Sequence, residues 1–323
     1  MLDTAKWTPS RVGILLNPHS GRNKQHLSTL RMLSTSIPGA LLQEVSTPQE
    51  MEDALRRWQL TPLDLLVIMG GDGTLQATLT TLLLDQASSL PRLVVVPGGT
   101  TNMSAADIGA RLKPVPALQA LNAWLHGSGK APKTMQRAVL RVDAGTSPGP
   151  QFGMFFGVGA VVSGVRYFHQ QIRPTGVRGS LGPALALGRL LFSLLRNKPH
   201  PLLPAMPAHI SAEHAKWQYD WLLVLASTLD RLLVGSRPYW GSEKGPVHFT
   251  AVINRPQRLF RVLPSLLAGR GASVAREQDG YISHNLNSLT LTDVTDFILD
   301  GELFKAHEPI RVSATEPLSF LTF

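Results

Sequence analysis

The residues most able to do chemistry lie in the stretch IMGGDGTLQATL, residues 68–79. Three glycines, one aspartate and one threonine separate an apolar run from an amphipathic one. Glycines let backbone N–H groups approach and point at an anion, and a helix that begins there adds its positive end. A D-G pair is also a hairpin signal, but the following TLQATLTTLLL has the length of a helix. The stretch therefore predicts a phosphate-binding loop between a strand and a helix.

Two further loops have the same character. NPHSG (Asn17 to Gly21) and PGGTTN (Pro97 to Asn102) place glycine and small polar residues where apolar runs end. Each loop alone is typical of an ordinary turn. In an open parallel sheet, however, ligands bind at the carboxyl ends of the strands. Three such loops at one edge favour a common site.

Asp72 needs a reason of its own, because a carboxylate in a phosphate-binding loop repels the ligand. A Mg²⁺ ion that bridges to nucleotide phosphates is the usual solution. The sequence has no G-x-x-x-x-G-K-[ST] motif, and no G-x-G-x-x-G follows the first apolar run. The pattern therefore indicates a nucleotide site that is neither a P-loop nor a Rossmann site.

The elements that must position these loops alternate between strand-like and helical segments. Strands are predicted in residues 11–18, 39–47, 63–70 and 92–99, and helices in residues 24–36, 48–59 and 74–86. Continuous Val, Ile and Leu runs that alternate with helices indicate parallel strands buried on both faces. The first part of the chain is therefore predicted to be a doubly wound α/β domain.

Beyond residue 133 the chain is rich in strand candidates joined by Gly and Pro turns, with helical insertions near 181–197 and 256–269. This pattern of short strands and turns predicts an antiparallel, β-sandwich-like domain. The predicted boundaries are 1–131 for the α/β domain and 132–307 for the β-rich domain, with residues 308–323 free to return to the first.

The composition indicates a soluble globular protein without cysteine, which excludes disulfides and thiolate metal sites. The N-terminus lacks the apolar segment of a secretory signal, and no apolar run is long enough to span a bilayer. We expect a cytoplasmic protein. No aromatic and basic interleaving typical of a nucleic-acid-binding module is present, so no nucleic-acid partner is expected.

The net charge is +9, and residues 165–198 carry basic residues and leucines but no acidic residue. This segment predicts peripheral contact with an anionic membrane surface, at the inner face of the membrane. The alternative is that its leucines pack under the second domain, with the arginines at the rim.

In this order and spacing, NPHSG, GGDGT and PGGTTN resemble the diacylglycerol kinase catalytic domain family, which includes bacterial lipid kinases and sphingosine kinases. FILDGELF (297–304) resembles the D-G-E element of that family, and FFGVGAVV (155–162) its G-x-G strand. The resemblance implies a two-domain lipid kinase that uses ATP and Mg²⁺, with both substrates between the domains. Diacylglycerol is the default lipid, with sphingoid bases, ceramide and phosphatidylglycerol left open.

The resemblance also implies roles for particular residues. Asp300 and Glu302 would face the lipid hydroxyl, one of them accepting its proton, while Asp72 would organise the metal ion. On a strand, Asp300 and Glu302 would share one face. The residues implied to hold the nucleotide are Asn17, Thr47, Gly70, Gly71, Asp72, Gly73, Thr74, Gln76, Thr100 and Asn102.

Two departures from the family pattern stand out. Gln76 and Ala77 occupy positions where relatives commonly have Asn-Glu. Lys244 precedes Gly245 where some relatives have an aspartate that holds a structural metal, and a cation cannot ligate a cation. These departures leave open a catalytically degenerate lipid-binding protein of the same fold. A second alternative is an NAD kinase-like enzyme, because NAD kinases share a GGDG loop and a similar two-domain shape.

Overall fold

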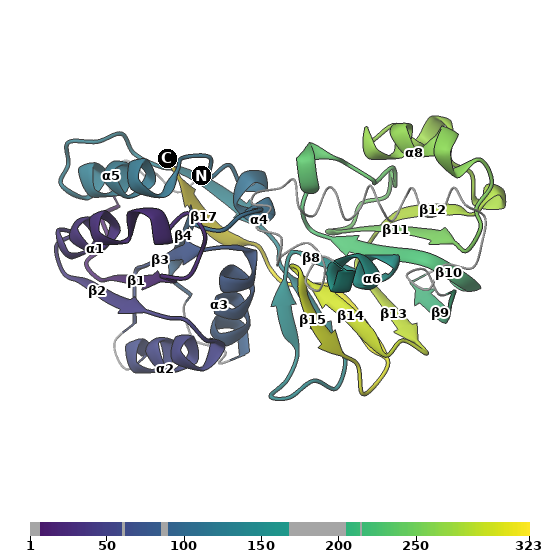
Figure 1. Cartoon of the computed structure of the whole chain (residues 1–323), viewed down its shortest axis with the longest axis horizontal. Helices are drawn as coiled ribbons and strands as arrows, with labels where there is room; N and C mark the ends of the chain where they lie inside the picture. Colours follow the sequence, from purple (N-terminus) through teal and green to yellow (C-terminus); the bar gives the residue numbers. More distant parts are fainter. Residues whose placement is uncertain (1–6, 60–61, 85–89, 168–204, 214) are drawn as a thin grey trace. The chain divides into compact units, whose positions relative to one another are not determined.

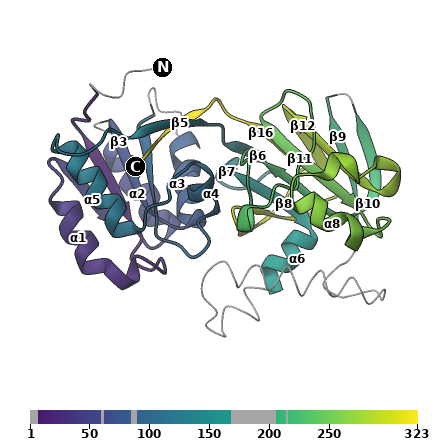
Figure 2. The same ribbon diagram turned by 90° about the horizontal axis from the view of Figure 1, so that it is seen from above.

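The computed structural model describes residues 7–59, 62–84, 90–167, 205–213 and 215–323. The chain forms two compact units (Figure 1). Unit 1 consists of Met1–Arg137 together with Glu316–Phe323, and unit 2 of Ala138–Thr315. The C-terminal end of the chain lies within unit 1, as Figure 2 also shows.

Unit 1 contains a six-stranded sheet in the order β2-β1-β3-β4-β17-β5. All neighbouring pairs are parallel except β17 and β5, which are antiparallel. The strands are β1 (Val12–Leu16), β2 (Ala40–Glu44), β3 (Leu65–Gly70), β4 (Arg92–Pro97), β5 (Lys133–Arg137) and β17 (Leu318–Thr322). Every residue of β1 and β3 is buried, as expected for parallel strands covered on both faces.

Helices cover both faces of this sheet. Helices α1 and α5 pack together on one face, and α2 and α3 pack together on the other (Figure 1). The helices are α1 (Leu27–Thr35), which the short η1 (Lys24–His26) precedes, α2 (Pro48–Gln59), α3 (Asp72–Leu84), α4 (Met103–Asp107) and α5 (Pro114–Leu125). The doubly wound α/β fold expected from the sequence is confirmed for unit 1.

Unit 2 is an antiparallel sheet of eleven strands within the described residues. Its main path runs β15-β14-β8-β10-β9-β13-β16-β6-β7, with β11 and β12 attached to β10. The strands are β6 (Leu140–Asp143), β7 (Gln151–Gly153), β8 (Phe155–Gly159), β9 (Met206–Ala212), β10 (Lys216–Ser227), β11 (Val247–Ile253), β12 (Tyr281–Leu286), β13 (Ser288–Thr292), β14 (Asp296–Leu299), β15 (Glu302–Lys305) and β16 (Ile310–Ala314).

Side chains from distant strands of this sheet bury a common core. Val142 of β6, Ile210 of β9 and Phe297 of β14 belong to one buried cluster. The sheet therefore curls around a shared interior, and the antiparallel β-rich fold expected for the second domain is confirmed. In its described residues, unit 2 also contains α6 (Ala160–Tyr167), α8 (Leu259–Leu267) and the short helical turns η4 (Leu233–Gly235), η5 (Gly271–Ser273) and η6 (Glu277–Asp279).

The structure differs from the sequence expectations in one place and does not describe another. Residues 155–162 were expected to form one strand, but Gly159 adopts a φ of 72° that ends β8, and α6 begins at Ala160. The helix expected near 181–197 and most of the predicted membrane-contacting segment 165–198 lie outside the described residues. None of the helices in the described ranges is long and apolar enough to cross a membrane.

The returning strand β17 generates a prediction about stability. Phe320 of β17 is completely buried beside β4 and β5. Replacing Phe320 with Ala should lower the free energy of unfolding by about 3–5 kcal/mol, because the lost apolar contacts leave a cavity. Chemical denaturation measures this loss. The matched control is Met32→Ala on the exposed side of α1, for which a change below about 0.5 kcal/mol is expected. Equal effects of the two substitutions would contradict the prediction.

Candidate functional site

The three glycine-containing loops meet at the carboxyl edge of the unit 1 sheet. They follow β1, β3 and β4, which are neighbours in the sheet. The N–H of Asn17 donates to the carbonyl oxygen of Met69 (2.9 Å), and the N–H of Gly98 donates to that of Gly70 (2.8 Å). The N–H of Arg22 donates to the carbonyl of Gly98 (2.8 Å). Each loop is therefore bonded to both of the others.

Glycine is required where the second and third loops touch. A Cβ atom on Gly99 would lie 2.5 Å from Cα of Gly71, closer than real side chains approach. The side chain of Asn102 stabilises the third loop through two hydrogen bonds to the backbone of Gly99. Its Oδ1 accepts the N–H of Gly99 (2.8 Å), and its Nδ2 donates to the carbonyl of Gly99 (2.7 Å). The φ of Asn102 is 50°, a conformation that asparagine tolerates better than most residues.

Asp72 joins the second loop to the helix that follows the third. Its Oδ2 accepts the N–H of Met103 (3.1 Å) and its Oδ1 that of Ser104 (3.0 Å), at the start of α4. Part of the residue's surface stays exposed, but the carboxyl group is enclosed by protein. Burial raises the pKa of Asp72, and the N–H groups of Ser104 and Met103 act in the opposite direction. The carboxylate therefore serves as the N-terminal cap of α4.

Donors for an anion remain at the start of α3. The first bond inside this helix runs from the N–H of Leu75 to the carbonyl of Gly71 (3.0 Å). The N–H groups of Asp72, Gly73 and Thr74 consequently have no partner inside the helix, and the helix dipole places positive charge there. Asn17 positions the side chain of Thr74, since its Nδ2 donates to Thr74 Oγ1 (3.1 Å).

Three exposed side chains lie on or just after the other two loops. Thr100 lies on the third loop, and Arg22 and Lys24 follow the first. Gly21 approaches Thr100, because a Cβ on Gly21 would lie 3.6 Å from Thr100 Oγ1. The loops thus combine helix N–H groups, a hydroxyl and two cations, which is a suitable environment for phosphate groups.

Two residues that the resemblance assigns to the nucleotide have other contacts. Thr47 caps α2, where its Oγ1 accepts the N–H of Glu50 (3.2 Å). Gln76 is buried one turn into α3, and its Nε2 donates to Thr80 Oγ1 (3.0 Å). The structure therefore groups Asn17, Gly70, Gly71, Asp72, Gly73, Thr74, Thr100 and Asn102 at the loops, and places Thr47 and Gln76 in separate hydrogen bonds.

Asn23 is a residue of this site that sequence reasoning missed. It is fully buried, and its Nδ2 donates to the carbonyl oxygens of Asn17 and Met69, both at 2.9 Å. It ties the first loop to the end of β3. The only signal in the sequence was its position two residues after NPHSG, within NPHSGRN, which gives no hint of such distant contacts.

The motif DGE in unit 2 forms a tight hairpin. Leu299 pairs with Glu302, so Asp300 and Gly301 are the two turn residues between β14 and β15. Both have positive φ angles, 50° and 88°, as a type I′ turn requires. The expectation that Asp300 and Glu302 face the same side of a strand is wrong, because Asp300 is in the turn and not on the strand.

The two carboxylates consequently have different environments. Asp300 is buried; its Oδ2 accepts the N–H of Met154 and its Oδ1 that of Phe155, both at 2.9 Å. Gly153 leaves the necessary space, since a Cβ there would lie 2.6 Å from Asp300 Oδ2. Glu302 is exposed at the first position of β15. Asp300 thus holds the turn to the β7–β8 connection, while Glu302 is accessible to a substrate.

Comparison with known protein families connects this geometry to an enzyme class. Residues 11–129 match the diacylglycerol kinase catalytic domain family. The resemblance carried by the sequence motifs is thereby confirmed, and the matched range contains all three loops. The D-G-E element lies outside the matched range. No curated protein sequence matches the chain.

Three solved structures that are similar to this chain come from Bacillus anthracis str. Sterne. Two are provisionally assigned as diacylglycerol kinases, with TM-scores of 0.69 and 0.68 at 16% and 14% identity; each match covers 98% of this chain and 99% of the other. A third, a diacylglycerol kinase, has a TM-score of 0.63 at 14% identity, with 98% of both chains covered. At these identities the comparisons establish the fold.

The three loops of unit 1 offer little to hold a metal ion by protein ligands alone. Both carboxylate oxygens of Asp72 already accept backbone N–H groups. Within the described ranges, no three His, Asp or Glu side chains come together in a metal-binding arrangement. The loops fit phosphate oxygens better than a cation. Any Mg²⁺ here would be carried by the nucleotide phosphates and water, as is common for this ion.

The segment around Lys244, compared above with a structural metal site, is organised by protein donors. The neighbouring Glu243 accepts the N–H of Asn285 through Oε2 (3.0 Å), and its Oε1 lies 2.6 Å from His284 Nδ1. Burial would raise the pKa of Glu243, but these donors outweigh it and lower the pKa to about 2. The carboxylate is thereby bound without a metal ion.

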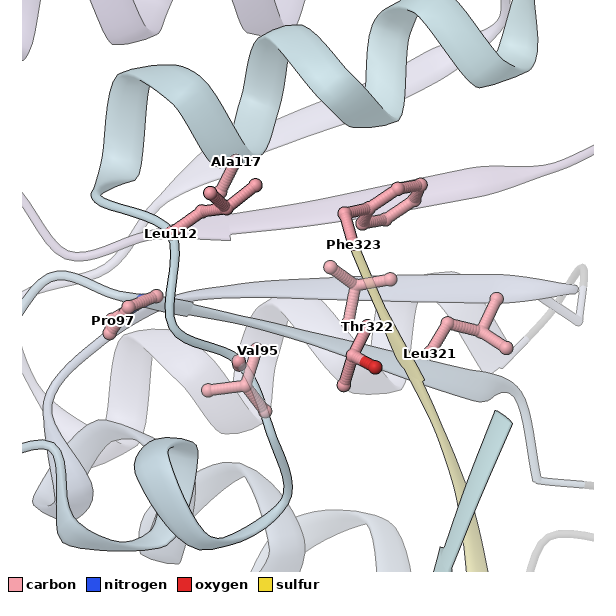
Figure 3. A pocket seen from close by; sticks show the side chains of 9 residues that line it. Val95, Pro97, Leu112, Ala117, Leu321, Thr322 and Phe323 are labelled. Carbon is pink, nitrogen blue, oxygen red and sulfur yellow. The ribbon is translucent and has the colours of Figure 1, made fainter. Parts of the chain in front are cut away.

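A small apolar pocket of unit 1 lies apart from the loop donors. Figure 3 shows Val95, Leu112, Ala117 and Phe323 around it, contributed by β4, the approach to α5, α5 and the end of the chain. Of the three loops, only Pro97 reaches it. The pocket has no group that could neutralise a phosphate, so we do not assign it to the nucleotide.

The contacts of Asp72 predict a structural role that substitution can test. Asp72→Asn places an NH₂ group against one of the two backbone N–H donors, so one buried hydrogen bond is lost. We expect the free energy of unfolding to fall by about 1–3 kcal/mol, together with weaker nucleotide binding. Denaturation and calorimetry measure the two effects. Asp53→Asn, on the exposed surface of α2, is the matched control. Unchanged stability of the Asp72 variant would show that the cap is unimportant.

The lowered pKa of Glu243 predicts a pH dependence. Because the folded-state pKa of about 2 lies below the ordinary value of 4.5, its contribution to stability is complete above about pH 4.5 and is lost as the pH falls toward 2. Glu243→Gln should therefore flatten the decrease in unfolding free energy over this range. Glu308→Gln, at another exposed acid of unit 2, should leave the decrease unchanged. Parallel pH profiles for wild type and Glu243→Gln would contradict the prediction.

Proposed function

We propose that this protein is an ATP-dependent lipid kinase that phosphorylates a hydroxyl group of a membrane lipid, with diacylglycerol as the default substrate. The observation that carries the proposal is the convergence of the three loops at the start of α3, inside the range that matches the diacylglycerol kinase catalytic domain. An exposed carboxylate in the D-G-E hairpin supplies the second part of the chemistry.

The nucleotide would bind through its phosphates. The N–H groups of Asp72, Gly73 and Thr74 would donate to phosphate oxygens, and Thr100 would add its hydroxyl. Arg22 and Lys24 are exposed beside the first loop and would offset the negative charge. Phosphoryl transfer depends mainly on positioning and on neutralisation of charge, so such a set of donors is an adequate basis for catalysis. Mg²⁺ bound to the phosphates would supply further neutralisation.

Glu302 is the better candidate for the general base. A base must be able to take a proton, and the oxygens of Asp300 are occupied by two backbone donors. Glu302 would accept the proton of the lipid hydroxyl while the hydroxyl oxygen of the lipid forms a bond to the γ-phosphorus of ATP. The bond to the β,γ-bridging oxygen breaks, and ADP leaves with the electron pair. Asp300 would act as a positioning residue that holds the hairpin.

The function is tested directly with purified protein, ATP and a panel of acceptors. The panel contains diacylglycerol, a sphingoid base, ceramide, phosphatidylglycerol and NAD, and mass spectrometry detects the phosphorylated product. Phosphorylation of a lipid and not of NAD supports the proposal. A product from NAD alone would favour an NAD kinase, and ATP binding without any product would favour a degenerate lipid-binding protein.

The different roles proposed for Glu302 and Asp300 give a further prediction. Glu302→Gln should lower kcat by about 10²–10⁴-fold with little change in nucleotide affinity or stability, because only the proton acceptor is removed. Asp300→Asn should instead destabilise the fold by about 1–3 kcal/mol, because a buried hydrogen bond is lost. Steady-state kinetics and denaturation separate the two effects, with Glu308→Gln as the control. Near-normal kcat in Glu302→Gln would exclude it as the base.

A further inference from the structure

Two linked segments of unit 2 combine exposed apolar side chains with basic ones. They are α8 and the turn η4 with the residues that flank them, and we call them together the α8 surface. Val234 at the tip of η4 is 81% exposed, and Phe260 on α8 is 41% exposed. Pro264 and Ala268 continue the exposed stripe of Phe260 along α8, at intervals of four residues.

The turn and the helix are held together. The N–H of Arg237, just after η4, donates to the carbonyl of Leu267 at the end of α8 (2.8 Å). At the other end of the helix, Arg258 pairs with Asp279 (2.7 Å), and the hydroxyl of Tyr281 donates to the carbonyl of Gln257 (2.6 Å). The exposed residues of the α8 surface are therefore presented on a fixed frame.

The opposite side of α8 anchors it to the sheet. Val262 and Leu266 are buried in a cluster with Leu222 of β10, Val252 of β11 and Tyr281 of β12. Figure 1 shows α8 beside β11 and β12. Because this face already satisfies the helix's need for burial, Phe260 and Val234 are not exposed for lack of a core. Their exposure is a property of the outer face.

The backbone of η4 also indicates that the exposed position of Val234 has a purpose. Val234 has a φ of 56° and a ψ of 24°, the left-handed conformation. A β-branched residue in that region is a genuine outlier that costs free energy, and glycine or asparagine would be the ordinary choice. A strained, exposed valine is explained if its side chain is needed for contact with an apolar phase.

The charge in the segment that contains α8 is basic, while Asp230 precedes η4 and Asp279 lies beside the start of α8. Residues 244–276 contain no Asp or Glu, and their basic residues are all exposed: Lys244, Arg255, Arg258, Arg261, Arg270 and Arg276. Arg258 is paired with Asp279. Among the described residues, neither Arg261 nor Arg270 forms an ion pair with an acidic side chain. An apolar stripe with unpaired basic neighbours complements a bilayer that has anionic headgroups.

We infer that the α8 surface docks this protein on an anionic lipid bilayer, with Val234 and Phe260 entering the interface and Arg261 and Arg270 contacting the headgroups. The choice of a lipid surface over other anionic partners rests on the proposed function, since a lipid kinase must reach a substrate that stays in the membrane. The surface is distinct from the residues proposed for catalysis, so vesicle binding and turnover can be measured separately.

The test is sedimentation of the full-length protein with vesicles of phosphatidylcholine alone or mixed with phosphatidylglycerol. Wild type should bind the mixed vesicles only, and binding should be lost near 1 M salt, where the Debye length is about 3 Å. Val234→Ser with Phe260→Ser, and separately Arg261→Glu with Arg270→Glu, should each weaken binding by about tenfold or more. The second pair leaves the apolar stripe intact, so the two sets report independently.

Matched controls separate this surface from bulk charge and hydrophobicity. Lys216→Glu with Arg311→Glu makes the same charge change elsewhere on unit 2, and Met32→Ser removes an exposed apolar side chain of unit 1. Both controls should bind like wild type. Equal losses in the controls, no binding to mixed vesicles at low salt, or full binding by both α8-surface variants would overturn the inference. Loss of binding only in Arg189→Glu with Arg196→Glu would assign docking to residues 165–198 instead.

Failure of the docking surface and failure of the proposed function give different results. Activity toward diacylglycerol dispersed in detergent micelles does not require a bilayer, so the α8-surface variants should retain it while losing activity on vesicles. If wild type binds anionic vesicles through this surface but phosphorylates no lipid in micelles, the docking inference stands and the lipid kinase proposal fails.

Discussion

The capping of α4 by Asp72 is the interaction on which the geometry of the loops depends. It adds a side-chain connection between the second and third loops to the backbone contacts through their glycines. The same contact resolves the conflict of placing a carboxylate in an anion site, because two N–H groups of α4 bind that charge. The N–H groups at the start of α3 then remain available, and Arg22 and Lys24 are exposed just after the first loop. One hydrogen-bonded carboxylate both builds the site and keeps it attractive to phosphate.

Unit 2 uses the same device at a different place. Asp300 also binds two consecutive backbone N–H groups, and in this way it secures a turn whose positive φ angles the chain must maintain. In both units the aspartate of the motif, Asp72 or Asp300, therefore holds a backbone segment in place by accepting two N–H groups. The accessible carboxylate is the neighbouring Glu302, so a motif that looks like a catalytic pair divides into one structural and one reactive group.

Local patterns were sufficient to predict much of the fold. Helix α2 occupies the residues expected from its spacing, 48–59, and apolar runs located β1, β3 and β4 closely. Contacts between distant residues were not predictable in this way. Asn23 bonds Met69, and Asp300 bonds Met154, and neither partner is marked by type or spacing. The hairpin at Asp300–Gly301 did have a signal, the D-G pair, but a continuous strand was the simpler reading of apolar residues on both sides.

The position of β17 has a consequence for how the chain acquires its structure. This strand lies between β4 and β5 in the first sheet, although unit 2 separates it from both in sequence. During synthesis from the N-terminus, unit 2 can complete its own hydrogen bonding before unit 1 can. Until residues 318–322 arrive, the apolar edge of β4 has no partner on that side, and such edges recruit strands from other chains. A nascent or truncated form is therefore the species most exposed to aggregation and most dependent on chaperones.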